Sequence, residues 1–204
     1  QVAQRCGTPR FVVCDGAVEL RETVDVLEKA GEKVVVLGDF KHFAANRFEK
    51  RVGKSERFKS FCSQMGKTRC QVQQTELAHL TPLSLKTKAR FMNIGPLVYW
   101  ARMILHMLDN PNDDAVADVE ASRLSEKLGW VKSYRDDIAS WGRCCELIDG
   151  SLGWINTQGL DRDSGDQLEK YLDSSRAWDS DSPEGKLRQE WIDVGGHSAA
   201  HLEE

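Results

Sequence analysis

The chain has 204 residues, of which 40% are hydrophobic and 29% are charged, and its formal net charge is −4. This is the composition of an ordinary soluble protein, with enough residues for one large domain or two small ones. No apolar run approaches the roughly 18 residues of a membrane-spanning helix, so no membrane partner is expected. The six cysteines form no CxxC pair and no zinc-type spacing with histidine, which predicts reduced thiols in a cytoplasmic protein.

Two short apolar runs near the start of the chain, 11–14 and 34–37, have the pattern of strands buried on both faces. The residues between them predict an amphipathic helix, whose apolar positions recur at i, i+4 and i+7: Leu20, Val24 and Leu27. Gly31 follows, where a helix commonly ends with a left-handed residue. The segment is therefore expected to be a strand–helix–strand unit with parallel strands.

An acid follows each expected strand: Asp15 after the first and Asp39 after the second. Since the carboxyl ends of parallel strands lie at one edge of a sheet, the two carboxylates could share a divalent metal, Mg²⁺ or Mn²⁺. Equally, each acid could simply cap a turn or a helix. His42 lies three residues after Asp39, where it could orient that acid, contact a phosphate, or have only a structural role.

From Lys41 onward the apolar pattern becomes helical. Ser55 is a predicted N-cap, and Gly95-Pro96 begins the clearest helix, because proline is favoured at the first helical position. The expected helices are 43–52, 55–80, 95–110, about 119–128 and 131–148. The final segment, 161–204, is rich in Ser, Asp, Gly and Glu and is expected to be a weakly structured acidic tail, with a short helix over 165–171.

The net charge conceals a strong asymmetry along the chain. Residues 40–90 contain twelve Lys or Arg against three acids, whereas residues 109–204 contain ten against twenty-two. A basic segment of this kind can follow a phosphate backbone, although a charge run can also be only the solvated face of a helix. The candidate DNA-contacting residues are Arg47, Lys50, Arg51, Lys54, Arg57, Lys59, Lys67 and Arg69.

Several of these segments resemble one protein family. Val13-Cys14-Asp15-Gly16-Ala17-Val18-Glu19-Leu20 resembles the strand-end acid motif of the RNase H-like DDE transposases of bacterial insertion sequences. Asp39-Phe40-Lys41-His42 is similar to a following strand end in one such group. Three later stretches resemble the helical insertion of that group: 73–77, 88–93 and 130–135. The resemblance covers roughly residues 10–160.

The resemblance implies an α/β fragment of an RNase H-like fold with a large helical insertion, predominantly α overall. The implied organisation is a partial α/β core over 1–40, a basic-to-acidic helical insertion over 41–160, and the tail over 161–204. Asp15 would be the catalytic acid and metal ligand that matches the second acid of the DDE triad. Asp39 and His42 would be auxiliary residues beside it.

The intact parent enzyme would cut and join DNA phosphodiesters with Mg²⁺ or Mn²⁺, and its partner would be the DNA of transposon ends. Self-association into a homo-oligomer is a further expectation. The other two acids of the triad have no match in this sequence, so this chain is expected to be inactive by itself. Two alternatives stay open: a non-catalytic helical DNA-binding module, and a small phosphate-handling α/β enzyme that uses Asp15.

Overall fold

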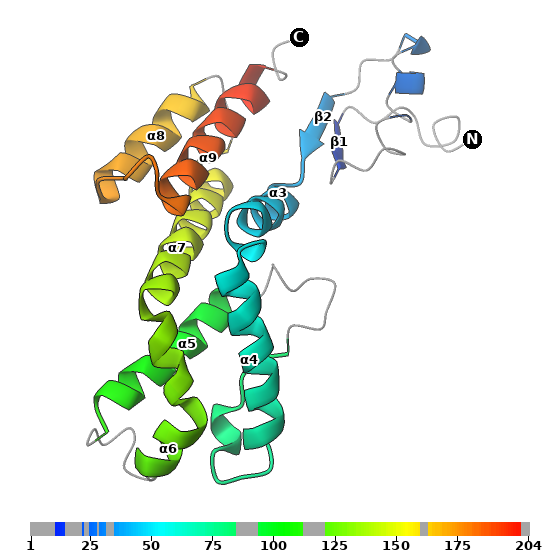
Figure 1. Ribbon diagram of the computed structural model, residues 1–204. Helices are drawn as coiled ribbons and strands as arrows, with labels where there is room; N and C mark the ends of the chain where they lie inside the picture. Colours follow the sequence, from blue (N-terminus) through cyan, green and yellow to red (C-terminus); the bar gives the residue numbers. More distant parts are fainter. Residues whose placement is uncertain are drawn as a thin grey trace. The chain divides into compact units, whose positions relative to one another are not determined.

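The structure is a computed structural model that describes residues 11–14, 22, 25–27, 29–31, 35–84, 94–111, 121–159 and 163–200 (Figure 1). The chain divides into two compact units. The central unit comprises residues 48–146, and the terminal unit comprises residues 1–47 and 147–204. This division differs from the expected boundaries at residues 40 and 160, because residues from both ends of the chain form one unit.

The terminal unit contains β1 (Phe11–Cys14), β2 (Val35–Gly38), α3 (Phe40–Phe48) up to Arg47, the second part of α7 (Arg135–Gln158), α8 (Ser164–Ser175) and α9 (Pro183–Ala200). The central unit contains Phe48, η1 (Glu49–Gly53, a π-helical turn), α4 (Glu56–Val72), η2 (Ala78–Leu80), α5 (Ile94–Asp109), α6 (Ala121–Leu128), η5 (Gly129–Tyr134) and the first part of α7. The described residues are therefore mostly helical.

The two strands pair in parallel, with Phe11 opposite Val35 and Cys14 opposite Gly38. β1 has the expected bounds, and β2 begins one residue later than expected. Gly31 has a φ of 81°, the left-handed conformation predicted for the residue after the helix.

The predicted RNase H-like α/β fold is nevertheless wrong, and the fold is helical. In the part of the chain that the structure describes, β structure is limited to this one pair of four-residue strands. Two short strands do not form an independently stable sheet, and the principal helix contacts are with other helices, above all between α8 and α9. The described apolar residues therefore form their core mainly between helices rather than against a sheet.

The two clearest helices of the central unit begin where their sequences predict, although α4 ends at Val72 rather than at residue 80. Ser55 caps α4, with its Oγ accepting a hydrogen bond of 3.2 Å from the backbone N–H of Phe58. In α5 the whole predicted apolar face is buried: Leu97, Trp100, Ala101, Ile104, Leu105 and Leu108. The indole Nε1 of Trp100 donates to the carbonyl oxygen of Leu80 at 2.9 Å, so this buried polar group is satisfied.

An aromatic cluster forms the core of the central unit around Phe61 of α4. The ring of Phe61 lies 5.3 Å from that of Trp130, 5.2 Å from Tyr134 and 5.1 Å from Trp141, measured between centroids. Phe58 also packs edge-on against Trp141, at 5.1 Å. These contacts join α4 to η5 and to the first part of α7, and edge-to-face packing adds to the free energy of burial.

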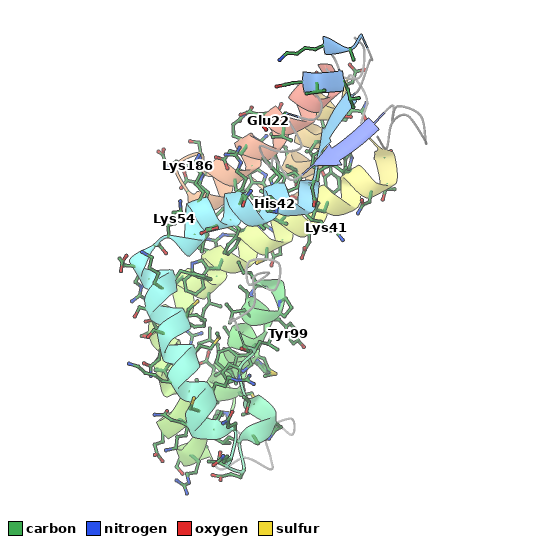
Figure 2. All side chains as sticks on the ribbon, turned by 90° about the vertical axis from the view of Figure 1, so that its right-hand side faces the viewer. Glu22, Lys41, His42, Lys54, Tyr99 and Lys186 are labelled. Atoms are coloured by element: carbon green, nitrogen blue, oxygen red, sulfur yellow. The ribbon has the colours of Figure 1, made fainter. Side chains whose placement is uncertain are left out.

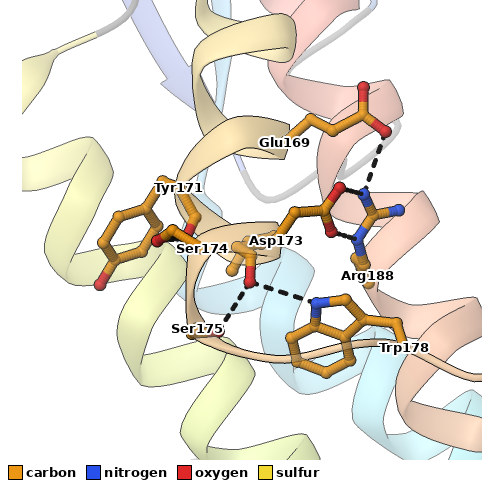
Figure 3. A network of polar contacts seen from close by, with 8 residues as sticks. Glu169, Tyr171, Asp173, Ser174, Ser175, Trp178 and Arg188 are labelled. Atoms are coloured by element: carbon orange, nitrogen blue, oxygen red, sulfur yellow. Dashed lines mark hydrogen bonds and ion pairs between the residues drawn. The ribbon is translucent and has the colours of Figure 1, made fainter.

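The terminal unit differs from the expected tail, because residues of 161–204 form the two packed helices α8 and α9. Arg188 of α9 donates to Asp173 Oδ1 at 2.8 Å and to Glu169 Oε1 at 3.0 Å, both on α8 (Figure 3). Trp178, in the connection between the helices, donates from Nε1 to the Leu172 carbonyl at 3.2 Å. Packing and paired charges therefore order a segment with weak sequence periodicity.

Trp191 is the central side chain of this unit. It is fully buried, its ring stacks on Phe40 at 6.2 Å, and Phe43 meets it edge-on at 5.1 Å. These contacts hold α9 against α3, which is about 150 residues away along the chain. One core therefore joins residues from both ends of the chain.

Candidate nucleic-acid interface

The Asp39 carboxylate caps α3. Its Oδ1 accepts hydrogen bonds from the backbone N–H groups of Lys41, at 2.9 Å, and His42, at 3.2 Å. The Asp39 carbonyl accepts the next one, from the N–H of Phe43 at 2.8 Å. This is the arrangement by which an aspartate satisfies the first N–H groups of a helix. Of the two roles left open for Asp39, the structure supports the helix cap.

The His42 side chain is exposed on the first turn of α3, beside the exposed Lys41 (Figure 2). The backbone N–H of His42 contacts the Asp39 carboxylate, and the imidazole does not. Asp15, the predicted catalytic acid, lies outside the described residues. Among the described residues, no group of three or more His, Cys, Asp or Glu side chains gathers as a metal site. Because Asp15 is not among the described residues, the Mg²⁺ or Mn²⁺ centre of the parent enzyme stays a prediction.

Arg57 is the most strongly bound of the eight candidate DNA-contacting residues. Its Nε donates to Asp137 Oδ2 at 3.0 Å, and its Nη2 donates to the Ser133 carbonyl at 2.7 Å. The guanidinium carbon also lies 4.4 Å from the centre of the Tyr134 ring. The hydrogen bond to Asp137 is the main cause that raises the pKa of Arg57 above its usual value. Arg57 therefore ties α4 to η5 and α7.

Three more of these candidates have partners within their own unit. In the terminal unit, Arg47 lies 3.5 Å from Glu190 Oε1 and 4.9 Å from the centre of the Phe43 ring. In the central unit, Arg69 Nη1 donates to the Pro82 carbonyl at 2.7 Å. Lys59 pairs with Glu56 at 2.7 Å, one turn earlier in α4. The arginines in particular are held by these contacts, so they are poorly placed to reorient toward a phosphate.

The remaining candidates differ in exposure. Arg51 is half-buried, whereas Lys50, Lys54 and Lys67 are exposed. Lys54 follows η1, two residues before α4 begins (Figure 2). Lys67 lies on the outer face of α4, opposite its buried apolar residues. Within the described residues, the side chains of Lys54 and Lys67 make no hydrogen bond or ion pair. They are the cations of this segment best placed to meet an external anion.

A second basic group lies at the C-terminal end of α5, where sequence reasoning proposed no site. Lys132 Nζ donates to the Leu108 carbonyl at 3.1 Å and lies 3.4 Å from Asp109 Oδ1. Arg135 Nη2 lies 2.8 Å from Asp109. The hydrogen bond from Arg135 is the main cause that lowers the pKa of Asp109. Two cations thus surround one carboxylate, leaving a net positive charge.

Tyr99 of α5 is a further residue that sequence reasoning missed. Its side chain is 73% exposed, the largest fraction among the large hydrophobic residues described (Figure 2). The sequence did contain a signal, because Tyr99 lies outside the predicted apolar face of its helix. An exposed tyrosine on a well-packed helix offers an aromatic surface to a partner.

Comparisons with known proteins do not identify the chain: no family model, curated protein or solved structure matches it. In the described part of the molecule, no helix has both the length and the apolar character needed to cross a bilayer.

Proposed function

We propose that the chain is a non-catalytic helical module that binds DNA through the exposed lysines of the central unit. The observation that carries the proposal is the contrast within the predicted basic segment. Arg57 and Arg69 are held by intramolecular partners, whereas the Lys54 and Lys67 side chains extend into solvent. Flexible lysines at a surface can contact phosphates without breaking contacts that stabilise the fold.

The charge balance supports an anionic partner. Residues 40–90 carry twelve Lys or Arg against three acids, in a chain whose overall net charge is −4. A local excess of this size attracts a polyanion and produces binding that weakens as salt rises. The three acids are Glu49, Glu56 and Glu76, and two of them are paired: Glu56 with Lys59, and Glu76 with Arg123. Paired acids repel a phosphate less than isolated ones do.

The sequence resemblance to insertion-sequence transposases supports DNA as the polyanion. It also supports a transposase origin, in which the intact parent would cut and join DNA with Mg²⁺ or Mn²⁺ and Asp15 would be one metal ligand. For the 204-residue chain itself, the capping role of Asp39 favours binding without strand cleavage. DNA nicking by this chain in the presence of Mg²⁺ would contradict the non-catalytic assignment.

The test is the affinity for a fluorescein-labelled duplex, measured by fluorescence anisotropy from 50 to 300 mM salt. The variant Lys54→Gln/Lys67→Gln removes two exposed charges from the central unit. Its matched control, Lys170→Gln/Lys186→Gln, removes two exposed charges from α8 and α9. Each phosphate contact contributes about 0.9 to the slope of log K against log salt, so the first variant should reduce the slope by about 2.

The control should keep both the affinity and the salt slope of the wild type. Equal losses in the two double variants would mean that net charge, rather than this surface, attracts DNA. The absence of salt-dependent DNA binding by the wild type would overturn the proposal itself.

A further inference from the structure

The exposed face of α5 presents planar side chains in a single row. Tyr99, Arg102 and His106 are all exposed and recur at i, i+3 and i+7, so they lie on the side of the helix opposite its buried face. At 1.5 Å of rise per residue, the row spans about 10 Å along the helix axis. Tyr99 begins the row and is 73% exposed (Figure 2).

Arg102 is oriented by α7. Its Nη1 donates to Glu146 Oε1 at 2.9 Å, and it crosses Gly142, where a Cβ atom would lie only 1.9 Å from Nη2. The absence of a side chain at residue 142 therefore makes room for the guanidinium. His106 is oriented in turn by Asn110, whose Nδ2 lies 3.1 Å from Nδ1 of the imidazole. Two side chains of the row, Arg102 and His106, are thus held by neighbouring residues.

The row ends at the basic group formed by Lys132 and Arg135 around Asp109. Asp109 follows Arg102 and His106 on the same face of α5, at i+10 from Tyr99. Cations are also favoured there by the partial negative charge of the helix C-terminus. An aromatic surface at one end and a net positive charge at the other are the two elements of a surface that binds single-stranded nucleic acid.

We infer that this face of α5 binds an unpaired segment of DNA, with Tyr99 stacking on a base and the net positive charge of Lys132 and Arg135 around Asp109 attracting the phosphates. The inference rests on the proposed DNA binding and specifies the form of the ligand. Bases in a duplex have their faces covered by neighbouring base pairs, whereas an unpaired base offers its face to a tyrosine. Among the neighbours of Tyr99 on this face, Pro96 is exposed and Met103 is half-buried, while the exposed Arg102 and His106 favour a nucleic acid over an apolar protein surface.

The experiment compares a 20-nucleotide single strand with a blunt duplex of the same sequence, both labelled and measured by anisotropy. Tyr99→Ala should weaken binding of the single strand by about five-fold or more, from the loss of one base–aromatic contact. Binding of the duplex should change by less than two-fold. Tyr99→Trp keeps an aromatic face and should restore binding of the single strand. The matched control is Tyr171→Ala on α8, which removes a tyrosine that is 44% exposed.

A second measurement locates the contact directly. A single strand carrying 5-bromodeoxyuridine should form a photo-crosslink to the peptide that contains Tyr99, and the crosslink should disappear in Tyr99→Ala. If single strand and duplex both bind but Tyr99→Ala binds them like the wild type, the inference is wrong and the proposed DNA binding stands. If neither DNA binds, the proposed function fails as well. A Tyr99→Ala variant that changes only the oligomeric state, seen by light scattering, would assign this face to a second copy of the chain and overturn the inference.

Discussion

The Asp39 carboxylate accepts a hydrogen bond of 3.2 Å from the backbone N–H of His42. The two residues were the candidate auxiliary pair of a metal site, and their relationship is that of a helix cap to the first turn of its helix. The carboxylate is held by backbone groups of α3, while the imidazole extends into solvent. This local geometry gives Asp39 a role in stability that does not need a metal ion.

The cap predicts how substitutions of Asp39 behave. Asp39→Ala should lower the free energy of unfolding by about 1 kcal/mol, because two backbone N–H groups lose their acceptor. Asp39→Asn retains an oxygen acceptor and should stay close to the wild type. Urea denaturation followed by circular dichroism measures both. A metal ligand would behave differently: Asn would then be as damaging as Ala, and Mg²⁺ would stabilise only the wild type.

Burial of Trp191 predicts a large effect on the terminal unit. Trp191→Ala should cost about 3–5 kcal/mol, because it empties a fully buried site between α3 and α9. Trp191→Phe should cost less, since it keeps an aromatic ring and removes an indole N–H that has no described partner. Hydrogen exchange should show the loss of protection in α8 and α9.

The matched variant for the central unit is Phe61→Ala, which empties the aromatic cluster around Trp130 and Trp141. It should lower the protection of backbone amides from hydrogen exchange mainly in α4 and η5. Identical exchange patterns in Phe61→Ala and Trp191→Ala would indicate that the two units unfold as one, contrary to their separate cores.

Arg57 is expected to act on stability rather than on DNA binding. Arg57→Lys keeps the charge but loses the paired contacts with Asp137 and Ser133, so the melting temperature should fall. Its affinity for duplex DNA, measured below the melting range, should match that of the wild type. A loss of affinity with an unchanged melting temperature would instead make Arg57 a DNA contact.

The carboxylates of Asp149 and Asp109 should have opposite effects on the stability of the folded protein as the pH rises. Burial raises the pKa of Asp149 in the folded protein, so its ionisation opposes folding as the pH rises above the unfolded value of 3.8. Asp149→Asn should therefore be modestly more stable than the wild type at pH 7. The two proteins should converge as the pH falls through 3.8, in urea denaturation at a series of pH values.

The pKa of Asp109 is lowered, mainly by its hydrogen bond from Arg135. Its contribution to stability is thus fully present above the unfolded value of 3.8 and is lost as the pH falls through the lower folded value. Asp109→Asn should be less stable than the wild type at pH 7, with a difference that shrinks in acid. Because the carboxylate lies at the surface, high salt should also reduce the difference.

Local sequence patterns predicted the elements whose signals lie within one or two turns. The apolar spacing in α5, the Ser55 cap of α4 and the bounds of β1 all follow from neighbouring residues. The α9 helix was missed because its glycines and serines weaken the pattern. A signal was present in Ser182-Pro183, an N-cap followed by proline: Ser182 Oγ accepts from the N–H of Gly185 at 3.0 Å.

The basic segment illustrates what the sequence by itself determined. Its positive charge, its helical spacing and its candidate lysines could all be read from consecutive residues. Only the tertiary structure decided which cations remain available, because partners such as Arg57 and Asp137 are 80 residues apart and meet only when α4 packs on η5 and α7. The same packing leaves Tyr99 outside the core. Hydrophobic burial brings distant segments together, and the charges and rings that it leaves at the surface define the candidate interface.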